Sequence, residues 1–369
     1  MKEKVLILYG GPSVEHDISI ITALQAMRFL PKKFDFLPIY IDRNGVWWTA
    51  DNLQDIKIYK NFHAFAKEKK QVTLCLGKKL LLKKRGNKFI SLCEVLSVLN
   101  CCHGRIGEDG CLQGVCESCD IAYTSCNEKT SAICMDKVFV KDVLEKNGIE
   151  TTQYVWFDGD FDVGLAKKKV KNLGYPVVIK PANLGSSIGI SVCKTEDELE
   201  KAFSLAKEFD DKILVEKLVS PLREFNCACL LYKENFFVSK VNEVSDKGEI
   251  YSFEDKYIQR LVQAKKVDKS IEKKIKRLTE RVYKLLGCRG VVRVDFLFDD
   301  KEKKLYVNEI NTIPGSLAFY LFENVKFSEL IECLVDESLD EKNKKRQKVT
   351  SFESGALNIF EEVQFLSKK

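Results

Sequence analysis

Apolar runs separated by short polar turns open the chain. Val5–Tyr9 is an unbroken apolar run typical of a buried strand, Gly10–Pro12 indicates a turn, Ser19–Leu30 has helical character, and Phe36–Ile41 returns to strand. This order predicts a βαβ unit. Parallel units of this kind place binding groups at the carboxyl ends of their strands, so we expect a functional loop directly after the first strand.

The same pattern of strand and loop returns further along the chain. Val95–Asn100 is another apolar run, and the polar, glycine-rich stretch at residues 103–110 follows it. Ser131–Lys146 is predicted as one helix, while Pro176–Lys180 and Gly189–Cys193 are predicted as strands on either side of a Gly-Ser-rich turn. These elements fit a change of domain near residue 126.

The C-terminal half contains one strongly amphipathic segment. Asp268–Gly287 carries apolar residues at spacings of four, three, four and three, which predicts a helix. Its lysines and arginines fall on the opposite face, which is more typical of a solvated surface than of a nucleic-acid site. The mixed-charge run Asp336–Lys348 predicts a loosely attached C-terminal tail.

Composition narrows the class of protein. The chain has 369 residues, of which 60 are basic and 54 acidic, so its net charge is +6. With 45% hydrophobic residues this composition indicates a globular protein of two or three domains and excludes intrinsic disorder. No uncharged apolar run approaches the roughly 18 residues of a membrane span, and no signal peptide is recognisable, so we expect no membrane partner and a cytoplasmic protein. Basic residues are dispersed among the acids, which argues against nucleic acid.

The cysteines leave one alternative open. There are 14 cysteines and three histidines. In a cytosolic chain of this length we interpret the cysteines as free thiols rather than as a disulfide framework. Cys116 and Cys119 form a C-x-x-C pair with further cysteines nearby, so a zinc or redox protein stays an alternative. We favour the simpler interpretation, because a free cysteine behaves as a small buried hydrophobe.

A predicted hairpin carries the most informative chemistry. Val291–Phe298 and Lys304–Asn311 are strand-like runs joined by a short polar link. With the turn centred near residue 302, antiparallel pairing and period-two alternation bring four polar residues to one face of the hairpin. In this register the opposite pairs are Asp295 with Glu309 and Arg293 with Asn311.

The hairpin face indicates a hard cation. Two carboxylates directly across a ladder repel each other unless a positive charge lies between them. Asp295, Glu309 and Asn311 offer oxygen ligands, which suit Mg²⁺, and Mg²⁺ in proteins commonly takes its remaining ligands from water and substrate phosphates. The alternative from these residues alone is an exposed hairpin face with a surface ion pair.

A second element supports a nucleotide. In the Gly-Ser-rich turn after Lys180, Gly185 and Gly189 let the backbone approach an anion, Ser186 and Ser187 add donors, and Lys180 supplies positive charge. The GxxxxGK[ST] and GxGxxG fingerprints are absent from the sequence. An ordinary turn between two strands is the alternative.

Taken together, these segments resemble the D-alanine:D-alanine ligase family of the ATP-grasp superfamily, in order from about residue 5 to about residue 335. The motifs that carry the resemblance are Gly10-Gly11-Pro12-Ser13-Val14-Glu15-His16, His103-Gly104 with Gly107-Glu108-Asp109-Gly110 and Gln113-Gly114, Met135-Asp136-Lys137, the loop from Lys180 to Gly189, Glu216-Lys217, Lys256-Tyr257, Arg293-Val294-Asp295 and Asn308-Glu309-Ile310-Asn311-Thr312-Ile313-Pro314-Gly315.

The resemblance implies an α/β fold. It predicts an N-terminal doubly wound parallel-sheet domain that binds substrate, followed by two α+β ATP-grasp subdomains with ATP between them. The implied domains are 1–125, 126–218 and 219–339, with a charged tail at 340–369. Small-molecule D-amino acids are the implied partners, and a homodimer is expected by family analogy.

The resemblance also implies roles for individual residues. The phosphates of ATP would contact Lys137 and Lys180, with Lys256 on a closing loop, while adenine and ribose would contact Glu216, Lys217, Val219 and Glu224. Magnesium, for which Mn²⁺ can substitute, would be held by Asp295, Glu309 and Asn311. The catalytic set would be Glu15 on the first ammonium, Ser186 and Tyr257 in a hydrogen-bonded chain with it, and Arg293 and the Gly315 N–H as oxyanion donors. His103, Ser316 and Leu317 would contact substrate.

The implied reaction is ATP-dependent synthesis of D-alanyl-D-alanine for peptidoglycan. A first D-alanine carboxylate attacks the γ-phosphate, and the amine of a second D-alanine displaces phosphate from the acyl phosphate. The chain departs from the family pattern after Gly315, where an ungapped comparison puts Tyr320-Leu321 at the place of Ser316-Leu317. Two alternatives therefore stay open, namely a ligase that uses D-serine as the acceptor and an ATP-binding paralogue without turnover.

Overall fold

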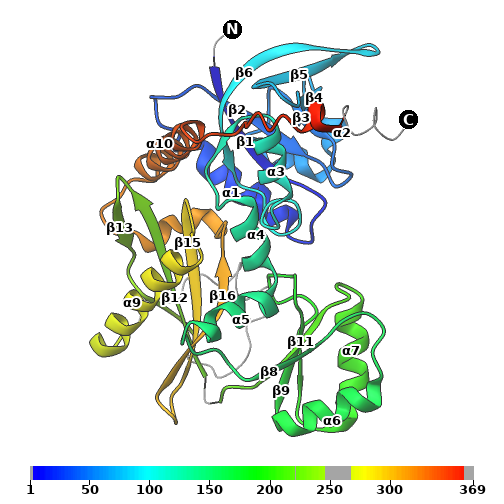
Figure 1. The fold of residues 1–369 in the computed structure, drawn as a ribbon, viewed down its shortest axis with the longest axis vertical. Coiled ribbons are helices and arrows are strands. Elements are labelled where there is room, and N and C mark those ends of the chain that lie inside the picture. Colours follow the sequence, from blue (N-terminus) through cyan, green and yellow to red (C-terminus); the bar gives the residue numbers. More distant parts are fainter. Residues whose placement is uncertain (1–2, 221, 246–266, 361–369) are drawn as a thin grey trace.

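A computed structural model describes residues 3–220, 222–245 and 267–360 of the chain. Three sheets follow one another along the sequence, and each carries its own helices (Figure 1). The molecule is elongated: the N-terminal sheet lies at one end, the sheet of residues 154–217 at the other, and the C-terminal sheet between them (Figure 1). No helix in the described part of the chain has both the length and the apolar character of a membrane span.

Strands and helices alternate along much of the chain. The strands are β1 (Glu3–Gly10), β2 (Phe36–Ile41), β3 (Trp47–Thr49), β4 (Lys70–Leu74), β5 (Leu80–Arg85), β6 (Lys88–Asn100), β7 (Ala122–Tyr123), β8 (Tyr154–Phe157), β9 (Val177–Pro181), β10 (Ser191–Cys193), β11 (Ile213–Lys217), β12 (Leu222–Tyr232), β13 (Asn235–Val238), β14 (Asn242–Ser245), β15 (Val291–Asp299) and β16 (Lys304–Asn311). The helices are α1 (His16–Met27), α2 (Phe62–Phe65), α3 (Cys111–Ser118), α4 (Glu128–Met135), α5 (Lys137–Lys146), α6 (Val163–Leu173), α7 (Leu199–Lys207), α9 (Lys269–Leu285) and α10 (Phe327–Arg346), with 3₁₀ turns η1 (Ile56–Lys60), η2 (Glu196–Glu198) and η3 (Gly315–Leu321).

The N-terminal sheet has a parallel core. Its order is β2, β1, β6, β7, and all three of these pairings are parallel, as the predicted βαβ opening requires. Strands β3, β4 and β5 add an antiparallel part that connects β2 to β6. The predicted doubly wound core is confirmed, and the antiparallel part has no counterpart in the sequence-based prediction.

Strand β1 is buried on both faces, which explains its continuous apolar run. Val5, Ile7 and Tyr9 belong to a hydrophobic cluster with residues of α1 and α10. Leu6 and Leu8 belong to the cluster on the opposite face, which includes α3. Helices therefore cover both faces of the parallel core, and the carboxyl end of β1 opens into the loop that carries Glu15.

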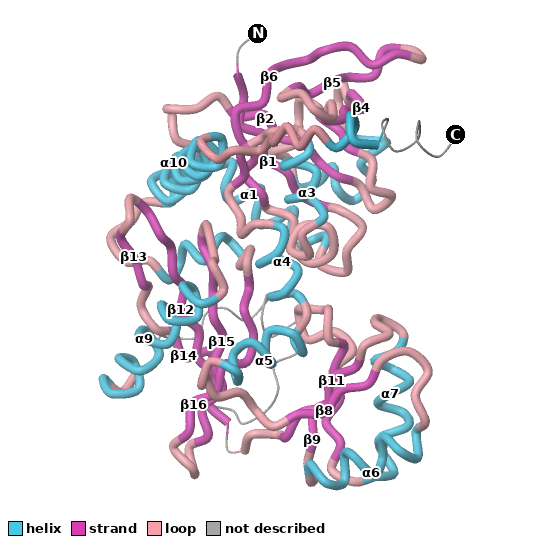
Figure 2. Tube along the Cα trace, viewed as in Figure 1, coloured by secondary structure: helices cyan, strands magenta, loops and turns pink. Residues whose placement is uncertain are grey.

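The two remaining sheets are antiparallel. The order β10-β9-β11-β8 is covered by α6 and α7, whose apolar faces pack against it. In the C-terminal sheet β12 pairs with β13, β14 and β15, and β15 pairs with β16. Helix α9, predicted from its apolar spacing, lies across this sheet (Figure 2).

The predicted helix at Ser131–Lys146 is wrong in one respect, because it is two helices. Asp136 has φ −82° and ψ 103°, which ends α4, and its carboxylate accepts hydrogen bonds from Val138 N and Phe139 N as the N-cap of α5. An N-cap of this kind competes with helix continuation. The break places Lys137 in the first turn of α5, with its N–H donating to Ala182 O at the end of β9.

The predicted tail at 340–369 is helical in its first residues. Helix α10 continues to Arg346. Its residues Lys342, Lys345 and Arg346 form ion pairs with Glu117 of α3 and with Asp120 just after α3. These contacts attach the end of α10 to the N-terminal sheet. Residues 340–346 therefore belong to an attached helix, while the predicted domain boundaries, including the start of the tail at residue 340, stay predictions.

Candidate active site

A cavity of about 780 Å³ opens between the second and third sheets. All the predicted nucleotide-contacting residues that the structure describes line this cavity: Lys137, Lys180, Glu216, Lys217, Val219 and Glu224. Two further predicted residues, Lys256 and Tyr257, lie outside the described residues.

Glu216 is the centre of a buried network at one wall of the cavity. Its Oε1 atom accepts from Lys141 Nζ at 2.7 Å and from the Thr152 hydroxyl at 2.6 Å, and Oε2 pairs with Lys180 Nζ. Burial by itself would raise the pKa of Glu216, but the two ammonium groups outweigh it and hold that pKa well below its usual range. Glu216 is therefore a carboxylate at neutral pH.

The other walls of the cavity are less charged. Lys217 Nζ donates to the carbonyls of Gly174 and Tyr175 at 2.8 and 3.0 Å, so its ammonium group is held by the backbone. Val219 is 8% exposed and contributes an apolar wall. An apolar wall beside backbone groups and a few charges is typical of a small-molecule site.

The hairpin of β15 and β16 has the predicted register. Arg293 lies opposite Asn311 and Asp295 opposite Glu309, with a bulge directly after Asp295. Arg293 binds both oxygens of Asp295 at 2.7 Å, and Asn311 Nδ2 donates to Asp295 Oδ2 at 3.0 Å. The four polar residues therefore share one face, as the alternation predicts.

Two cationic side chains on the hairpin face remove one of the reasons for expecting a metal ion there. Lys137 Nζ lies 3.2 Å from Glu309 Oε1, and Arg293 pairs with Asp295, so two cationic side chains already offset the repulsion between the carboxylates. Repulsion alone does not require a metal ion. The donor set still fits one, since two carboxylates and an amide oxygen on one rigid face suit a hard cation such as Mg²⁺.

A smaller cavity of about 340 Å³ adjoins the same hairpin face. Glu15, Glu108, Lys137 and Glu309 line it, together with Gly185 and Asn311. The Ser186 hydroxyl donates to Glu15 Oε1, which joins the loop after β9 to the loop after β1. Lys137 already pairs with Glu309, and burial raises the pKa of Glu108 to about 8, so Glu15 is the carboxylate of this cavity best suited to a cationic group such as an ammonium.

Two glycines allow the loops to approach Glu15. A Cβ at Gly185 would lie 3.1 Å from the Glu15 carboxylate oxygens. Gly104 has φ +68°, and a Cβ there would lie 2.7 Å from Glu15 Oε2. Side chains at these positions would displace the carboxylate, so the glycines of the two predicted loops serve close packing around Glu15.

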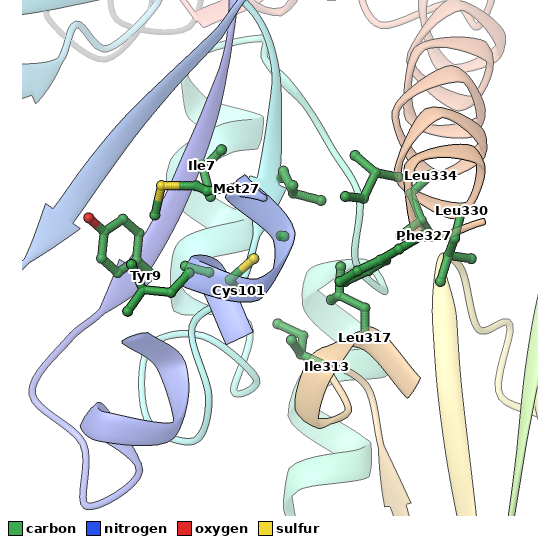
Figure 3. Close-up of a cluster of buried hydrophobic side chains, with 14 of the residues drawn as sticks. Ile7, Tyr9, Met27, Cys101, Ile313, Leu317, Phe327, Leu330 and Leu334 are labelled. Carbon is green, nitrogen blue, oxygen red and sulfur yellow. The ribbon is translucent and has the colours of Figure 1, made fainter. Parts of the chain in front are cut away.

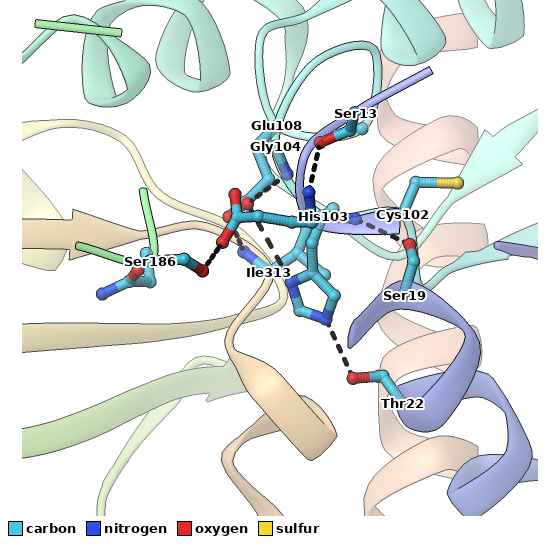
Figure 4. A network of polar contacts seen from close by, with 12 residues as sticks. Ser13, Ser19, Thr22, Cys102, His103, Gly104, Glu108, Ser186 and Ile313 are labelled. Carbon is cyan, nitrogen blue, oxygen red and sulfur yellow. Dashed lines mark hydrogen bonds and ion pairs between the residues drawn. The ribbon is translucent and has the colours of Figure 1, made fainter. Parts of the chain in front are cut away.

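His103 and Glu108 form a buried polar network between the N-terminal and C-terminal sheets (Figure 4). Glu108 accepts from Gly104 N at 2.8 Å and from Ile313 N at 3.0 Å, which ties together two loops that are distant in sequence. His103 Nε2 lies 2.9 Å from the Thr22 hydroxyl. Burial raises the pKa of Glu108 to about 8, with Glu15 adding to the shift, and burial lowers the pKa of His103 to about 4.

The side chain of Leu317, in the loop after Gly315, has a packing role that the sequence did not predict. Leu317 is 2% exposed and packs in the hydrophobic cluster of α10 with Phe327 and Leu330 (Figure 3). Ser316 N donates to the Thr22 hydroxyl at 3.1 Å. The structure thus gives the Leu317 side chain a core contact, while its predicted contact with substrate stays untested.

Tyr320 lies where the substrate-contacting residue falls in the ungapped comparison. Its hydroxyl is 3.5 Å from Arg293 Nη1. Residues 316–318 reach this arrangement through a left-handed turn, with φ between 50° and 54°. Such a turn of three non-glycine residues is costly, at about 1–2 kcal/mol per residue.

Sequence reasoning missed several residues of these networks. Lys141 follows Lys137 by four positions, which puts both on one face of α5, and this spacing was the available signal. Thr152 and Thr22 carry no sequence signal, because their role depends on partners that are distant in the chain. Glu108 stands in one of the family motifs without an assigned role, although a carboxylate in a glycine-rich loop commonly accepts backbone N–H groups.

The cysteines support the simpler interpretation. Cys116 and Cys119 are 0% exposed and belong to the core beneath α3. Burial raises the pKa of both thiols, whereas a reactive thiol needs a lowered pKa. Within residues 3–220, 222–245 and 267–360, no three His, Cys, Asp or Glu side chains are arranged to hold a metal ion.

Comparison with known proteins covers most of the chain. The family model for the D-ala D-ala ligase N-terminus matches residues 4–126, and the model for the D-ala D-ala ligase C-terminus matches residues 143–336. A D-alanine–D-alanine ligase from Thermosipho melanesiensis is 38% identical over 366 residues, covering 96% of this chain and 98% of that protein. A D-alanine–D-alanine ligase from Caldicellulosiruptor bescii is 36% identical, covering 96% and 100%.

Solved structures show the same architecture. The D-alanine-D-alanine ligase from Coxiella burnetii has a TM-score of 0.78 at 26% identity, covering 94% of this chain and 96% of that one. A D-Ala:D-Ser ligase from Enterococcus faecalis also has a TM-score of 0.78, at 28% identity, with coverage of 92% and 100%. The predicted ATP-grasp architecture is confirmed.

Proposed function

The chain belongs to the D-alanine–D-alanine ligase family, and on this premise we propose that it joins two D-alanines at the expense of ATP to supply D-alanyl-D-alanine for peptidoglycan. One observation carries the proposal for this chain. The larger cavity, with its lysines, and the smaller cavity, with its carboxylates, meet at the same hairpin face. A nucleotide and an amino acid held in these two cavities would meet beside Lys137 and Glu309.

We propose that Glu15 binds the ammonium group of the first D-alanine. Ser186 holds the Glu15 carboxylate, and Gly185 and Gly104 bring two loops against it. The substrate carboxylate then points toward the hairpin face, where it attacks the γ-phosphate of ATP to form an acyl phosphate and release ADP. Lys137 and Lys180 balance the charge of the phosphates, and charge balance with positioning is the main requirement of phosphoryl transfer.

Asp295, Glu309 and Asn311 would hold the magnesium ion. Their oxygen atoms suit a hard cation. The ion pairs of Glu309 with Lys137 and of Asp295 with Arg293 would rearrange to admit it. A bound Mg²⁺ would neutralise phosphate charge. Mn²⁺ has the same ligand preference and is expected to substitute.

We assign the oxyanion donors to Arg293 and the N–H of Gly315. When the second amine attacks the acyl phosphate, negative charge develops on the carbonyl oxygen, and fixed donors stabilise it. Arg293 is held by both oxygens of Asp295. Glu108 anchors the loop that leads to Gly315 through its bond to Ile313 N. The rigid support of both donors favours this assignment, because preorganised donors cost no reorganisation.

D-Serine is the second candidate for the acceptor. The placement of Tyr320 beside Arg293 makes the acceptor end of the site differ from the family pattern, and one relative of the same fold is a D-Ala:D-Ser ligase. A tyrosine hydroxyl can donate to a carboxylate or accept from a serine hydroxyl. D-Alanine stays the first choice, because the relatives with the greater identity are D-alanine–D-alanine ligases.

The test is phosphate release from ATP on addition of D-alanine and Mg²⁺, with mass and chirality of the product determined. We expect D-alanyl-D-alanine, no turnover after chelation, and recovery with Mg²⁺ or Mn²⁺. Competition between D-alanine and D-serine across pH separates the two acceptors. Absence of any dipeptide from D-amino acids would overturn the proposal.

We infer a cytoplasmic homodimer from family analogy. ATP and D-amino acids are cytoplasmic metabolites in this proposal, and the buried free thiols agree with a reducing compartment. Sedimentation of the purified protein at several concentrations tests the dimer, and a monomer at all concentrations would contradict it.

A further inference from the structure

Lys141 is a buried lysine that the proposed mechanism does not use. Its side chain is 1% exposed and lies behind Glu216 as seen from the cavity, while Lys180 and Glu216 line the cavity itself. Lys141 Nζ contacts Glu216 Oε1 at 2.7 Å and the Thr152 hydroxyl at 2.9 Å. A buried ammonium group is costly, so its retention calls for a specific partner or task.

The network contains one carboxylate and two ammonium groups. Glu216 Oε2 pairs with Lys180, and Glu216 Oε1 pairs with Lys141 and Thr152, so each carboxylate oxygen faces its own cation. Lys180 Nζ also lies 3.4 Å from Asn308 Oδ1 at the cavity. In this arrangement the ammonium group of Lys180 is shared between Glu216 and the space where a phosphate would bind.

A phosphate at Lys180 must compete with Glu216 for that ammonium group. If Lys180 were the only cation beside Glu216, moving it toward a phosphate would leave a buried carboxylate without a counter-ion, at high cost. Lys141 stays on the other oxygen and keeps the carboxylate paired while Lys180 moves. Burial lowers the pKa of Lys141 and Glu216 counteracts part of this shift, so the two groups depend on each other for their charge.

We propose that Lys141 is a positioning residue for nucleotide phosphate: it neutralises Glu216 from behind, and this leaves Lys180 available to bind the phosphates of ATP. The inference rests on the proposed function, because it takes the cavity to be the ATP site. Lys137, one turn earlier on α5, pairs with Glu309. The first two turns of α5 thus supply one cation to each of two carboxylates that face the cavity.

The test is Lys141→Met, which keeps the length of the side chain and removes its charge. Affinity is measured by calorimetry for a non-hydrolysable ATP analogue, and for adenosine by displacement of a fluorescent adenosine analogue, both without D-alanine. We expect the affinity for the ATP analogue to fall about tenfold, since one charge-assisted contact is lost, and that for adenosine to stay within about twofold. A purely structural role would weaken both ligands alike.

The same substitution at Lys167 is the matched control. Lys167 pairs with Glu200 on the outer face of the same subdomain, with 27% of its side chain exposed. Lys167→Met should leave both affinities unchanged. Removing the carboxylate as well, in Lys141→Met/Glu216→Gln, should bring the ratio of the two affinities back toward that of the wild type, because no anion then competes for Lys180.

Thr152→Val provides a milder variant in case Lys141→Met does not fold. It removes the hydroxyl that joins Lys141 to Glu216 and keeps both charges. We expect a loss of about threefold for the ATP analogue alone. Unchanged affinity for the ATP analogue in both variants, or an equal loss for adenosine, would overturn the inference. If the wild-type protein binds neither ligand, the proposed function itself fails.

Discussion

Three carboxylates of the candidate site, Asp295, Glu309 and Glu216, fall into two groups whose charge is balanced in different ways. Asp295 and Glu309 on the hairpin have 20% and 19% of their side chains exposed, and each has one cationic partner, Arg293 for Asp295 and Lys137 for Glu309. Glu216 has 4% of its side chain exposed and is enclosed by two lysines and a threonine. The hairpin pairs can exchange their partners for ligands, whereas the Glu216 network is built to keep its charge paired.

This difference distinguishes the residues proposed to bind ligands from the residues that stabilise the site. Exchangeable ion pairs suit ligands that arrive and leave in each turnover, because little burial energy is lost when a pair opens. An enclosed ion pair resists opening, because a buried charge without a partner costs several kcal/mol. Substitutions in the first group should therefore affect activity most, and substitutions in the second should affect stability most.

The largest expected effect is on the activity of Glu309→Gln. The change removes a proposed metal ligand and the partner of Lys137. We expect turnover to fall by about 1,000-fold, the size of other losses of transition-state charge stabilisation. Steady-state phosphate release measures it. Glu302→Gln, on the exposed turn of the same hairpin, is the control. If Glu309→Gln keeps activity within tenfold of wild type, the proposal that Glu309 exchanges Lys137 for a ligand is contradicted.

The second prediction compares matched amide substitutions for stability. Glu216→Gln leaves Lys141 and Lys180 buried without a carboxylate, so the free energy of unfolding should fall by about 3 kcal/mol. Asp295→Asn leaves Arg293 with 16% of its side chain exposed, more than Lys141 or Lys180, so the loss should be smaller, at about 1 kcal/mol. Urea unfolding of both variants without ligands measures the difference, and equal losses would remove the distinction between the two groups.

The third prediction concerns pH and Glu108. Burial and then Glu15 raise the pKa of Glu108 from 4.5 to about 8, so the folded protein holds a proton that the unfolded chain has released. The stability contributed by this group is complete below about pH 4.5 and is lost as the pH rises to about 8, with a slope of at most about 1.4 kcal/mol per pH unit. Urea unfolding across this range should show the slope in the wild type and a smaller one in Glu108→Gln. If Glu108→Gln leaves the slope unchanged, another group causes the pH dependence of the free energy of unfolding.

The smallest expected effect lies outside the site. Lys342 on α10 contacts Asp120 at 2.9 Å and Glu117 at 3.5 Å, with 10% of its side chain exposed. Lys342→Met should lower the free energy of unfolding by about 1 kcal/mol and leave turnover unchanged, because these partners belong to a peripheral ion pair. A loss of activity in this variant would show that the end of α10 influences the site.

Several features of the fold could be predicted from the sequence because they depend on local pattern. The apolar run of β1, the spacing of α9 and the register of the β15–β16 hairpin all follow from alternation and turn position. The break between α4 and α5 could not, because the helical pattern continues through it and the capping of Asp136 also involves Lys212 from a distant loop. Local pattern does not report a distant partner.

The sequence by itself determined which chemical groups this protein brings to its site: the ordered motifs, the carboxylates and amide of one hairpin face, and the lysine before the glycine-rich turn. Only the tertiary structure decided which cation pairs with which carboxylate, that Lys141 encloses Glu216, and that Leu317 packs in a core while Tyr320 faces Arg293. The physical reason is that pairing and burial depend on distances between segments far apart in the chain, whereas alternation and spacing are properties of neighbouring residues.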